Sequence, residues 1–143
     1  EMCIRDSLWL ILHEMVEEGV TVLVSTSYLD EAERCDRVAL LYEGKVLAMD
    51  TPFALMDFLP GEVVSVKGRE SRTTRDFIRG MPGVVSTALF GDSVHAVLEE
   101  GEDALTRLAE ALVVAGLTTE KVEPVEPTLE DVFVSLTGRG LRE

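Results

Sequence analysis

Three hydroxyl-bearing residues, Ser25, Thr26 and Ser27, directly follow an apolar stretch of the chain. Hydroxyl groups both donate and accept hydrogen bonds. The apolar stretch, residues 20–24, begins after Gly19 and is rich in valine, which is typical of a strand buried on both faces of a parallel sheet. In open α/β sheets, ligands bind beyond the carboxyl ends of such strands. The pattern therefore indicates a strand that ends at a ligand, although a plain strand-to-helix turn would have the same pattern.

The elements on either side would position Ser27. An amphipathic helix is predicted over residues 8–19, and a second helix should begin after Ser27, with Asp30 and Glu31 in its first turn. Ser27 would be the N-cap of this second helix and Asp30 its capping-box partner. Further along, residues 43–45 (Glu-Gly-Lys) separate two apolar runs and predict a hairpin, after which a helix opened by Thr-Pro ends at residue 59.

The same residues resemble a known family. Val22–Glu33 closely resembles the switch segment of ABC-transporter ATP-binding subunits, in which a hydrophobic strand ends in Ser-Thr-His and Asp-Glu-Ala-Glu follows. Leu8–Gly19 is similar to the helix before the family's last parallel strand, and Cys35–Pro52 is similar to the elements that close its nucleotide-binding domain. The resemblance covers residues 8–59 and implies an α/β fold, the carboxyl-terminal part of a P-loop NTPase domain.

Ser27 occupies the position of the family's switch histidine. In the family, this histidine reaches the γ-phosphate and helps to hold the attacking water and the catalytic carboxylate. A serine hydroxyl is shorter and uncharged, so the resemblance implies a degenerate catalytic position that is slow or inactive in hydrolysis and is paired with a competent site. The alternative is that Ser27 only caps the helix and an upstream residue does the work of the histidine.

The phosphate-binding elements of such a subunit are missing from this sequence. Gly44-Lys45 lacks the upstream glycine of a Walker A loop, no Leu-Ser-Gly-Gly-Gln signature is present, and no apolar strand ends in Asp-Glu. All of these elements precede the switch segment in the family. We therefore expect the chain to be the carboxyl-terminal part of a longer subunit that uses ATP and Mg²⁺. Alone, it should neither bind these cofactors tightly nor hydrolyse ATP.

The resemblance also implies partners: a second nucleotide-binding domain, in a dimer, and a membrane permease that holds the subunit at the cytoplasmic face of a membrane. The net charge of −14, from 13 basic and 27 acidic residues, argues against nucleic acid or an anionic membrane surface as a general partner. No apolar stretch approaches the roughly 20 residues of a transmembrane helix. Residues 1–7 do not match the family and are interpreted as a non-native junction.

A second domain is predicted over residues 60–143, because the pattern restarts at Pro60-Gly61. The alternation of apolar residues predicts a βαββαβ order, which suggests a small α+β ferredoxin-like sandwich with one added helix. The predicted elements are strand 62–67, helix 73–80, strand 84–90, strand 94–99, helix 102–115, strand 119–125 and helix 128–137.

The last helix has the clearest local pattern. Thr128 is predicted as its N-cap, with Asp131 three residues on, and Gly138 as its end. Residues 126–138 also resemble the end of export ATPases of the daunorubicin-resistance type, which implies that residues 60–143 are the accessory carboxyl-terminal domain of such a subunit. A different function class also remains open, a non-catalytic regulatory or small-ligand-binding module in which the predicted sandwich is the working part.

Other residues that could do chemistry lack suitable neighbours in the sequence. His13 and His95 have no triad or metal partners at useful spacing, and Cys3 and Cys35 show no disulfide or zinc pattern, so no metal site is predicted. A run of basic residues is interpreted as a solvated face, with a docking role as the alternative. It consists of Lys67, Arg69, Arg72, Arg75 and Arg79.

Overall fold

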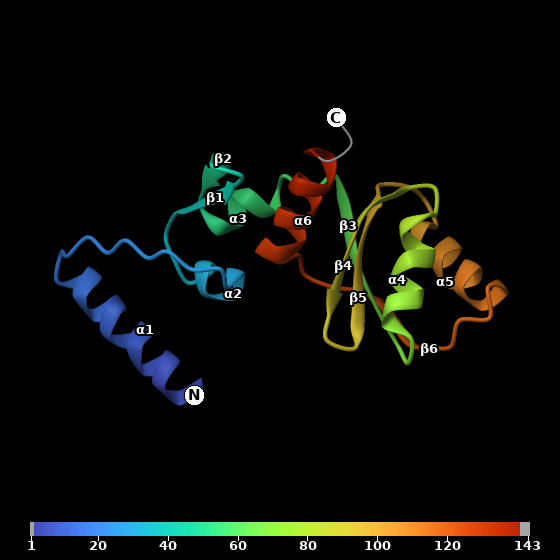
Figure 1. Ribbon diagram of the computed structural model, residues 1–143, viewed down its shortest axis with the longest axis horizontal. Coiled ribbons are helices and arrows are strands. Elements are labelled where there is room, and N and C mark those ends of the chain that lie inside the picture. The colour runs from blue at the N-terminus through green and yellow to red at the C-terminus, as the bar shows by residue number, and fades with distance from the viewer. Residues whose placement is uncertain (1, 141–143) are drawn as a thin grey trace.

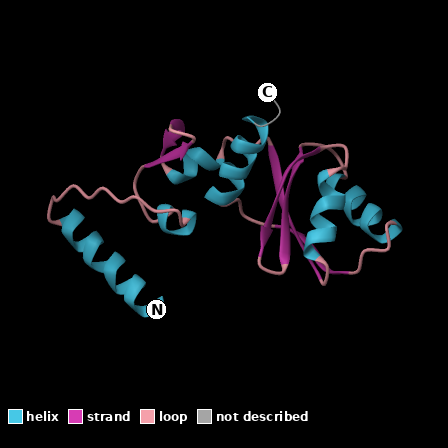
Figure 2. Cartoon of the chain, in the orientation of Figure 1, coloured by secondary structure: helices cyan, strands magenta, loops and turns pink. Residues whose placement is uncertain are grey.

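The computed structural model describes residues 2–140, which form a mixed α/β structure with two antiparallel sheets (Figures 1 and 2). None of the helices in this part of the chain is both long and apolar enough to span a bilayer. In chain order the elements are α1 (Met2–Glu17), α2 (Leu29–Ala32), β1 (Val38–Tyr42), β2 (Lys45–Asp50), α3 (Pro52–Met56), β3 (Gly61–Gly68), α4 (Ser71–Arg79), β4 (Val84–Phe90), β5 (Ser93–Glu99), α5 (Ala104–Val114), β6 (Thr119–Pro124) and α6 (Leu129–Gly140).

The larger sheet contains four strands in the order β4-β5-β3-β6, and each neighbouring pair is antiparallel. Helices α4 and α5 lie on one face of the sheet, and α6 lies on the opposite face (Figure 1). The elements predicted after residue 60 are confirmed in type and order. Their bounds differ from the prediction by at most two residues, except at the end of α6.

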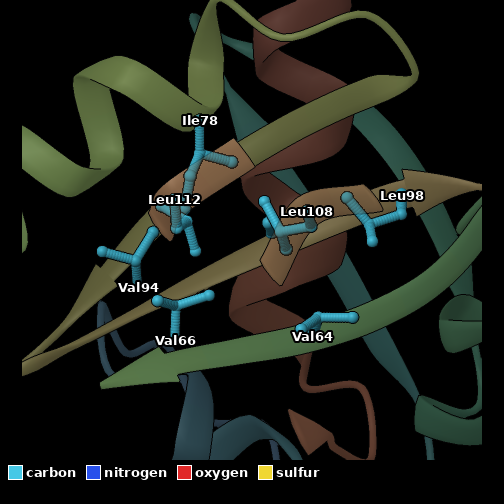
Figure 3. Close-up of a cluster of buried hydrophobic side chains, with 8 residues drawn as sticks. Val64, Val66, Ile78, Val94, Leu98, Leu108 and Leu112 are labelled. Carbon is cyan, nitrogen blue, oxygen red and sulfur yellow. The ribbon is translucent and has the colours of Figure 1, made fainter. Parts of the chain in front are cut away.

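The core beneath α4 and α5 follows from the two-residue period of the strands. Val64 and Val66 of β3 pair with Ala96 and Val94 of β5, and all four side chains are fully buried. Because successive residues of a strand point to opposite faces, Val63 lies on the α6 side of the sheet. The complete cluster, most of which Figure 3 labels, is Val64, Val66, Ile78, Val94, Ala96, Leu98, Leu108 and Leu112.

A second core joins the beginning of the chain to its last helix. Leu129 and Val132 of α6 are fully buried, and they cluster with Ala32 of α2 and Leu55 of α3. The hairpin β1–β2 adds Val38 and Leu40 to the same cluster. The packing therefore crosses the predicted boundary at residues 59 and 60, and the division into domains there stays a prediction.

The local signals around the small sheet are confirmed. The hairpin turns at Glu43 and Gly44, which both have positive φ angles, of 49° and 76°, as tight two-residue hairpin turns require. Helix α3 is capped by Thr51, whose Oγ1 accepts a hydrogen bond from the backbone N–H of Ala54 at 3.2 Å, and Pro52 occupies its first turn.

The predicted strand over residues 20–24 is wrong. These residues have no strand partner in the described part of the chain, and the side chain of Leu23 is 97% exposed. A strand needs hydrogen-bonded neighbours, and both described sheets are formed by other segments. The predicted end of the preceding helix holds, because α1 stops at Glu17 and Gly19 follows with a φ of 91°.

Three bounds of helices also differ from the prediction. Helix α3 ends at Met56 and not at residue 59, because the backbone N–H groups of Phe58 and Leu59 bond three residues back, as in a turn. Helix α6 continues through Gly138 to Gly140, so Gly138 does not end it, since an exposed glycine raises the cost of a helix without preventing it. Helix α1 begins at Met2, so residues 2–7, which were excluded from the fold prediction, are helical. Ser7 donates its hydroxyl to the carbonyl of Cys3 at 2.8 Å within this first turn.

Candidate functional site around Ser27 and the last helix

Ser27 lies exposed in the turn between the extended segment and α2. It does not cap the helix, because the N-cap position belongs to Tyr28, and Thr26 makes the hydrogen bonds of the turn. The Oγ1 atom of Thr26 accepts from the backbone N–H of Tyr28 at 3.0 Å and donates to Oε2 of Glu31 at 2.7 Å. A hydroxyl that bonds the backbone two residues on is a local turn motif. The predicted Ser27 cap with Asp30 is therefore wrong, and the Ser27 hydroxyl makes no described hydrogen bond.

Helix α1 is held against this turn by charged side chains. Nε of Arg5 lies 3.3 Å from Glu31, and its guanidinium lies 4.8 Å from the ring centre of Tyr28. Arg34 pairs with Asp6 at 3.0 Å. Arg34 and Asp6 are both largely exposed, so their pair contributes little to stability, whereas the side chain of Glu31 is only 14% exposed.

The helix after Ser27 makes direct contact with the last helix of the chain. Oε1 of Glu33, just after α2, accepts a hydrogen bond from the backbone N–H of Leu129 at 2.9 Å. Leu129 opens α6, whose first amides have no partner within the helix. A carboxylate at this end is favourable, because the helix dipole is positive there. The candidate site is therefore linked to the far end of the chain.

The beginning of α6 is organised by a buried carboxylate. Asp131 is 2% exposed, and its Oδ2 accepts from both the backbone N–H and the hydroxyl of Thr128, each at 2.9 Å. The backbone N–H of Asp131 in turn donates to Oγ1 of Thr128 at 3.3 Å. The predicted capping box of Thr128 and Asp131 is thus confirmed.

His95 has a partner that its sequence neighbourhood did not indicate. Nδ1 of His95 on β5 donates to Oδ1 of Asp131 at 3.1 Å, since a carboxylate can only accept. The imidazole also stacks on Phe90, with ring centres 4.0 Å apart. His95 is therefore a packed histidine that joins the sheet to the cap of α6. A separation of 36 residues carries no local signal for such a pair.

Burial changes the acidity of two groups near the site. Burial raises the pKa of Glu130, and the neighbouring Asp131 and Asp30 raise it further. Burial also raises the pKa of the Cys35 thiol, with Asp36 and then Glu31 adding to the effect. A raised thiol pKa leaves little thiolate at neutral pH, so Cys35 is a poor nucleophile.

The remaining candidates lie apart from this region. His13 is exposed on α1 and lies beside Trp9, with ring centres 6.1 Å apart. In the basic run, Lys67 pairs with Asp92 at 3.0 Å, and Arg75 pairs with Asp76. Within residues 2–140, no group of three or more histidine, cysteine or acidic side chains is arranged to hold a metal ion.

Comparison with known proteins relates the chain to ATP-binding proteins of exporters. The daunorubicin resistance ATP-binding protein DrrA2 of Streptomyces coeruleorubidus is 31% identical over 139 residues, which cover 94% of this chain and 43% of that protein. A probable multidrug ABC transporter ATP-binding protein, YbhF of Escherichia coli, is 54% identical over 137 residues, or 94% of this chain and 23% of YbhF. The Nod factor export ATP-binding protein I of Burkholderia lata is 30% identical over 141 residues, covering 97% and 44% respectively.

These relatives confirm the predicted resemblance to ATP-binding subunits of ABC transporters. Residues 55–137 match the family described as ATP-binding protein DrrA1-3-like, C-terminal domain. The chain belongs to this family. It spans less than half the length of each of the three relatives.

Proposed function

We propose that the chain is the carboxyl-terminal part of the ATP-binding and ATP-hydrolysing subunit of an ABC exporter. In this proposal residues 8–59 close the nucleotide-binding domain, residues 60–143 form an accessory domain, and residues 1–7 are a non-native junction. The subunit would pair with a second nucleotide-binding domain and with a membrane permease at the cytoplasmic face. Support comes from the family match and from relatives that are named as export proteins.

The observation that carries the proposal is the family match over residues 55–137. Within the chain, a hydrogen bond of 2.9 Å joins Glu33 to the backbone of Leu129. It joins the Asp-Glu-Ala-Glu segment, which in the family follows the switch residue, to the helix that ends the accessory domain. Ala32 and Leu129 pack beside it. An accessory domain held in this way can transmit a shift of the switch segment, and such a role fits a subunit that converts nucleotide state into movement.

ATP and Mg²⁺ would be held by residues outside this sequence. The chain has no glycine-rich loop whose amides could surround phosphates, and no lysine in the position that reaches them. The residues present therefore do not fit a nucleotide site of their own. We expect the chain alone neither to bind ATP tightly nor to hydrolyse it.

Ser27 would be a degenerate switch position in the complete subunit. Its side chain is exposed and its hydroxyl makes no described hydrogen bond, so a longer side chain at this position has room to extend. The test is to replace Ser27 by histidine in the complete subunit and to measure ATP hydrolysis. A higher rate for Ser27→His than for the unchanged subunit supports the proposal. An equal or lower rate contradicts it. Ser25→His is the control, because it adds a histidine beside the switch position and should not raise the rate.

The accessory domain is proposed to be a ferredoxin-like sandwich. The βαββαβ order of its elements, the strand order β4-β5-β3-β6 and the position of α4 and α5 on one face support this assignment. The alternative function, a regulatory or small-ligand-binding module, is favoured by one observation, a cavity within this sandwich.

A further inference from the structure

A cavity of about 380 Å³ opens between the turn before β4, the end of β5 and the first part of α5. Its volume lies within the range of roughly 300–1,000 Å³ that is usual for small-molecule sites. The residues that line it belong to the four-stranded part of the chain, and neither the segment around Ser27 nor α6 contributes to it. The proposed exporter function therefore does not account for this cavity.

The floor of the cavity is apolar and belongs to the packed core. Leu98 and Leu108 close it from beneath and are only 4% and 1% exposed (Figure 3 labels both), so the apolar surface open to a ligand comes from Met81 and Val84, which are partly exposed. The backbone N–H of Glu99 donates to the carbonyl of Gly83 at 2.8 Å and so ties two walls of the cavity together. The cavity is therefore preformed, which lowers the entropy cost of binding.

The rim of the cavity carries charges of both signs. Glu99, Glu100 and Arg107 line it, and all three are exposed. None of the three forms an ion pair with another residue of the described part of the chain. The guanidinium of Arg107 lies against Gly101, where a Cβ would be 3.5 Å from Nη2. Both kinds of charge are thus available to a ligand at the mouth.

We propose that this cavity binds a zwitterionic α-amino acid with a large apolar side chain. The side chain would lie on Met81 and Val84, the carboxylate would bind Arg107, and the ammonium group would bind Glu99 and Glu100. A ligand with a carboxylate alone would lose the interaction with the two glutamates, and an amine alone would lose the interaction with Arg107. This inference goes beyond the proposed exporter function and does not depend on it.

The first test uses the unchanged chain and three ligands that differ only in charge. L-phenylalanine, 2-phenylethylamine and 3-phenylpropanoate are titrated in turn, with calorimetry and with amide spectra recorded by NMR. L-phenylalanine should bind saturably and shift the amide signals of Gly83, Glu99 and Arg107. Each analogue should bind at least about tenfold more weakly, because one charge-assisted interaction is lost. No saturable binding at millimolar concentration, or equal binding of all three ligands, overturns the proposal.

The second test exchanges the charges of the rim. Arg107→Gln should weaken the binding of L-phenylalanine at least about tenfold and should not weaken the binding of 2-phenylethylamine. The double variant Glu99→Gln with Glu100→Gln should weaken the binding of L-phenylalanine and should not weaken that of 3-phenylpropanoate. The matched controls, Arg79→Gln and Glu120→Gln, change exposed charges outside the cavity and should leave binding unchanged. Equal losses for rim and control variants contradict the proposal. Circular dichroism checks that each variant is folded. If a variant is unfolded, the titrations of the unchanged chain with the three ligands still test the proposal.

Discussion

The carboxylate of Glu33 accepts a hydrogen bond from the backbone N–H of Leu129, although the two residues are 96 positions apart in the chain. Leu129 is fully buried, whereas Glu33 is an exposed residue that reaches across to the beginning of α6. The bond therefore fixes where the last helix starts relative to α2. It also connects the segment after Ser27 to the beginning of α6.

Glu33→Ala should weaken the contact between the segment after α2 and the beginning of α6. The variant loses one hydrogen bond to a charged acceptor and one favourable dipole contact, so the free energy of unfolding should fall by about 1 kcal/mol. Glu33→Gln keeps an acceptor oxygen and should lose less. Urea unfolding measures the change, and amide hydrogen exchange at Leu129 should accelerate. Glu18→Ala, at an exposed acid, is the control, and equal effects of the two alanine variants would show that the bond contributes nothing.

Asp131→Ala should lower the free energy of unfolding more than a substitution at an exposed position does. The carboxylate is buried and accepts bonds from Thr128 and His95, so its removal leaves several donors without partners in a site with little water. The expected loss is about 2–4 kcal/mol of unfolding free energy. Asp131→Asn keeps one acceptor oxygen and should lose less. Thermal and urea unfolding test this, with Asp57→Ala at an exposed position as control; a loss below about 0.5 kcal/mol refutes the expectation.

Gly61→Ala should destabilise the larger sheet. A Cβ at position 61 would overlap the carbonyl oxygen of Leu98 and lie 2.7 Å from its carbonyl carbon, so β3 and β5 would have to separate locally. Because backbone cannot move aside as a flexible side chain can, we expect a loss of about 3 kcal/mol. Gly80→Ala is the matched control, since its nearest neighbour would be 3.5 Å away. Similar unfolding midpoints for the two variants would contradict this reading of the packing.

Glu130 should make stability depend on pH. Its pKa is raised in the folded chain, so the folded state binds the proton more tightly than the unfolded state does. Stability from this group is therefore greatest below the unfolded pKa and is lost as pH rises through the raised, folded pKa. Glu130→Gln removes the titration. The difference in melting temperature between Glu130→Gln and the unchanged chain should shift in favour of the variant as pH rises from 4 to 7, about the range of carboxyl titration.

A pH-independent difference between these two chains would exclude this effect. The same experiment with Glu126→Gln serves as the control, because Glu126 is an exposed acid just before the same helix. NMR titration of the Glu130 carboxyl carbon gives the direction of the shift independently of unfolding.

The elements after residue 60 could be predicted because each carries its own local signal. In β3, Val64 and Val66 lie on either side of the polar Ser65, and Thr128 with Asp131 marks the beginning of α6. The strand predicted over residues 20–24 failed for a related reason. A run of valines indicates burial, but it cannot say whether partner strands are present in the same chain.

The candidate site could be predicted only in part from the sequence. The turn at residues 25–27 was located correctly, yet its hydrogen bonds are made by Thr26 rather than Ser27, and two adjacent hydroxyls cannot be told apart by pattern alone. The contacts from Glu33 to Leu129 and from His95 to Asp131 join distant segments. Such contacts are set by tertiary packing, for which periodicity and spacing give no signal.

The shared core of α2, α3 and α6 also has a consequence for synthesis. A chain leaves the ribosome from its amino end, so Ala32 and Leu55 emerge long before Leu129 and Val132, which cover them. Until then the apolar side chains of Ala32 and Leu55 remain exposed outside the ribosome, where chaperones can bind them. The four-stranded sheet and helices α4 and α5 share a core that contains no residue of α6. This part of the chain can therefore fold before α6 packs against α2 and α3.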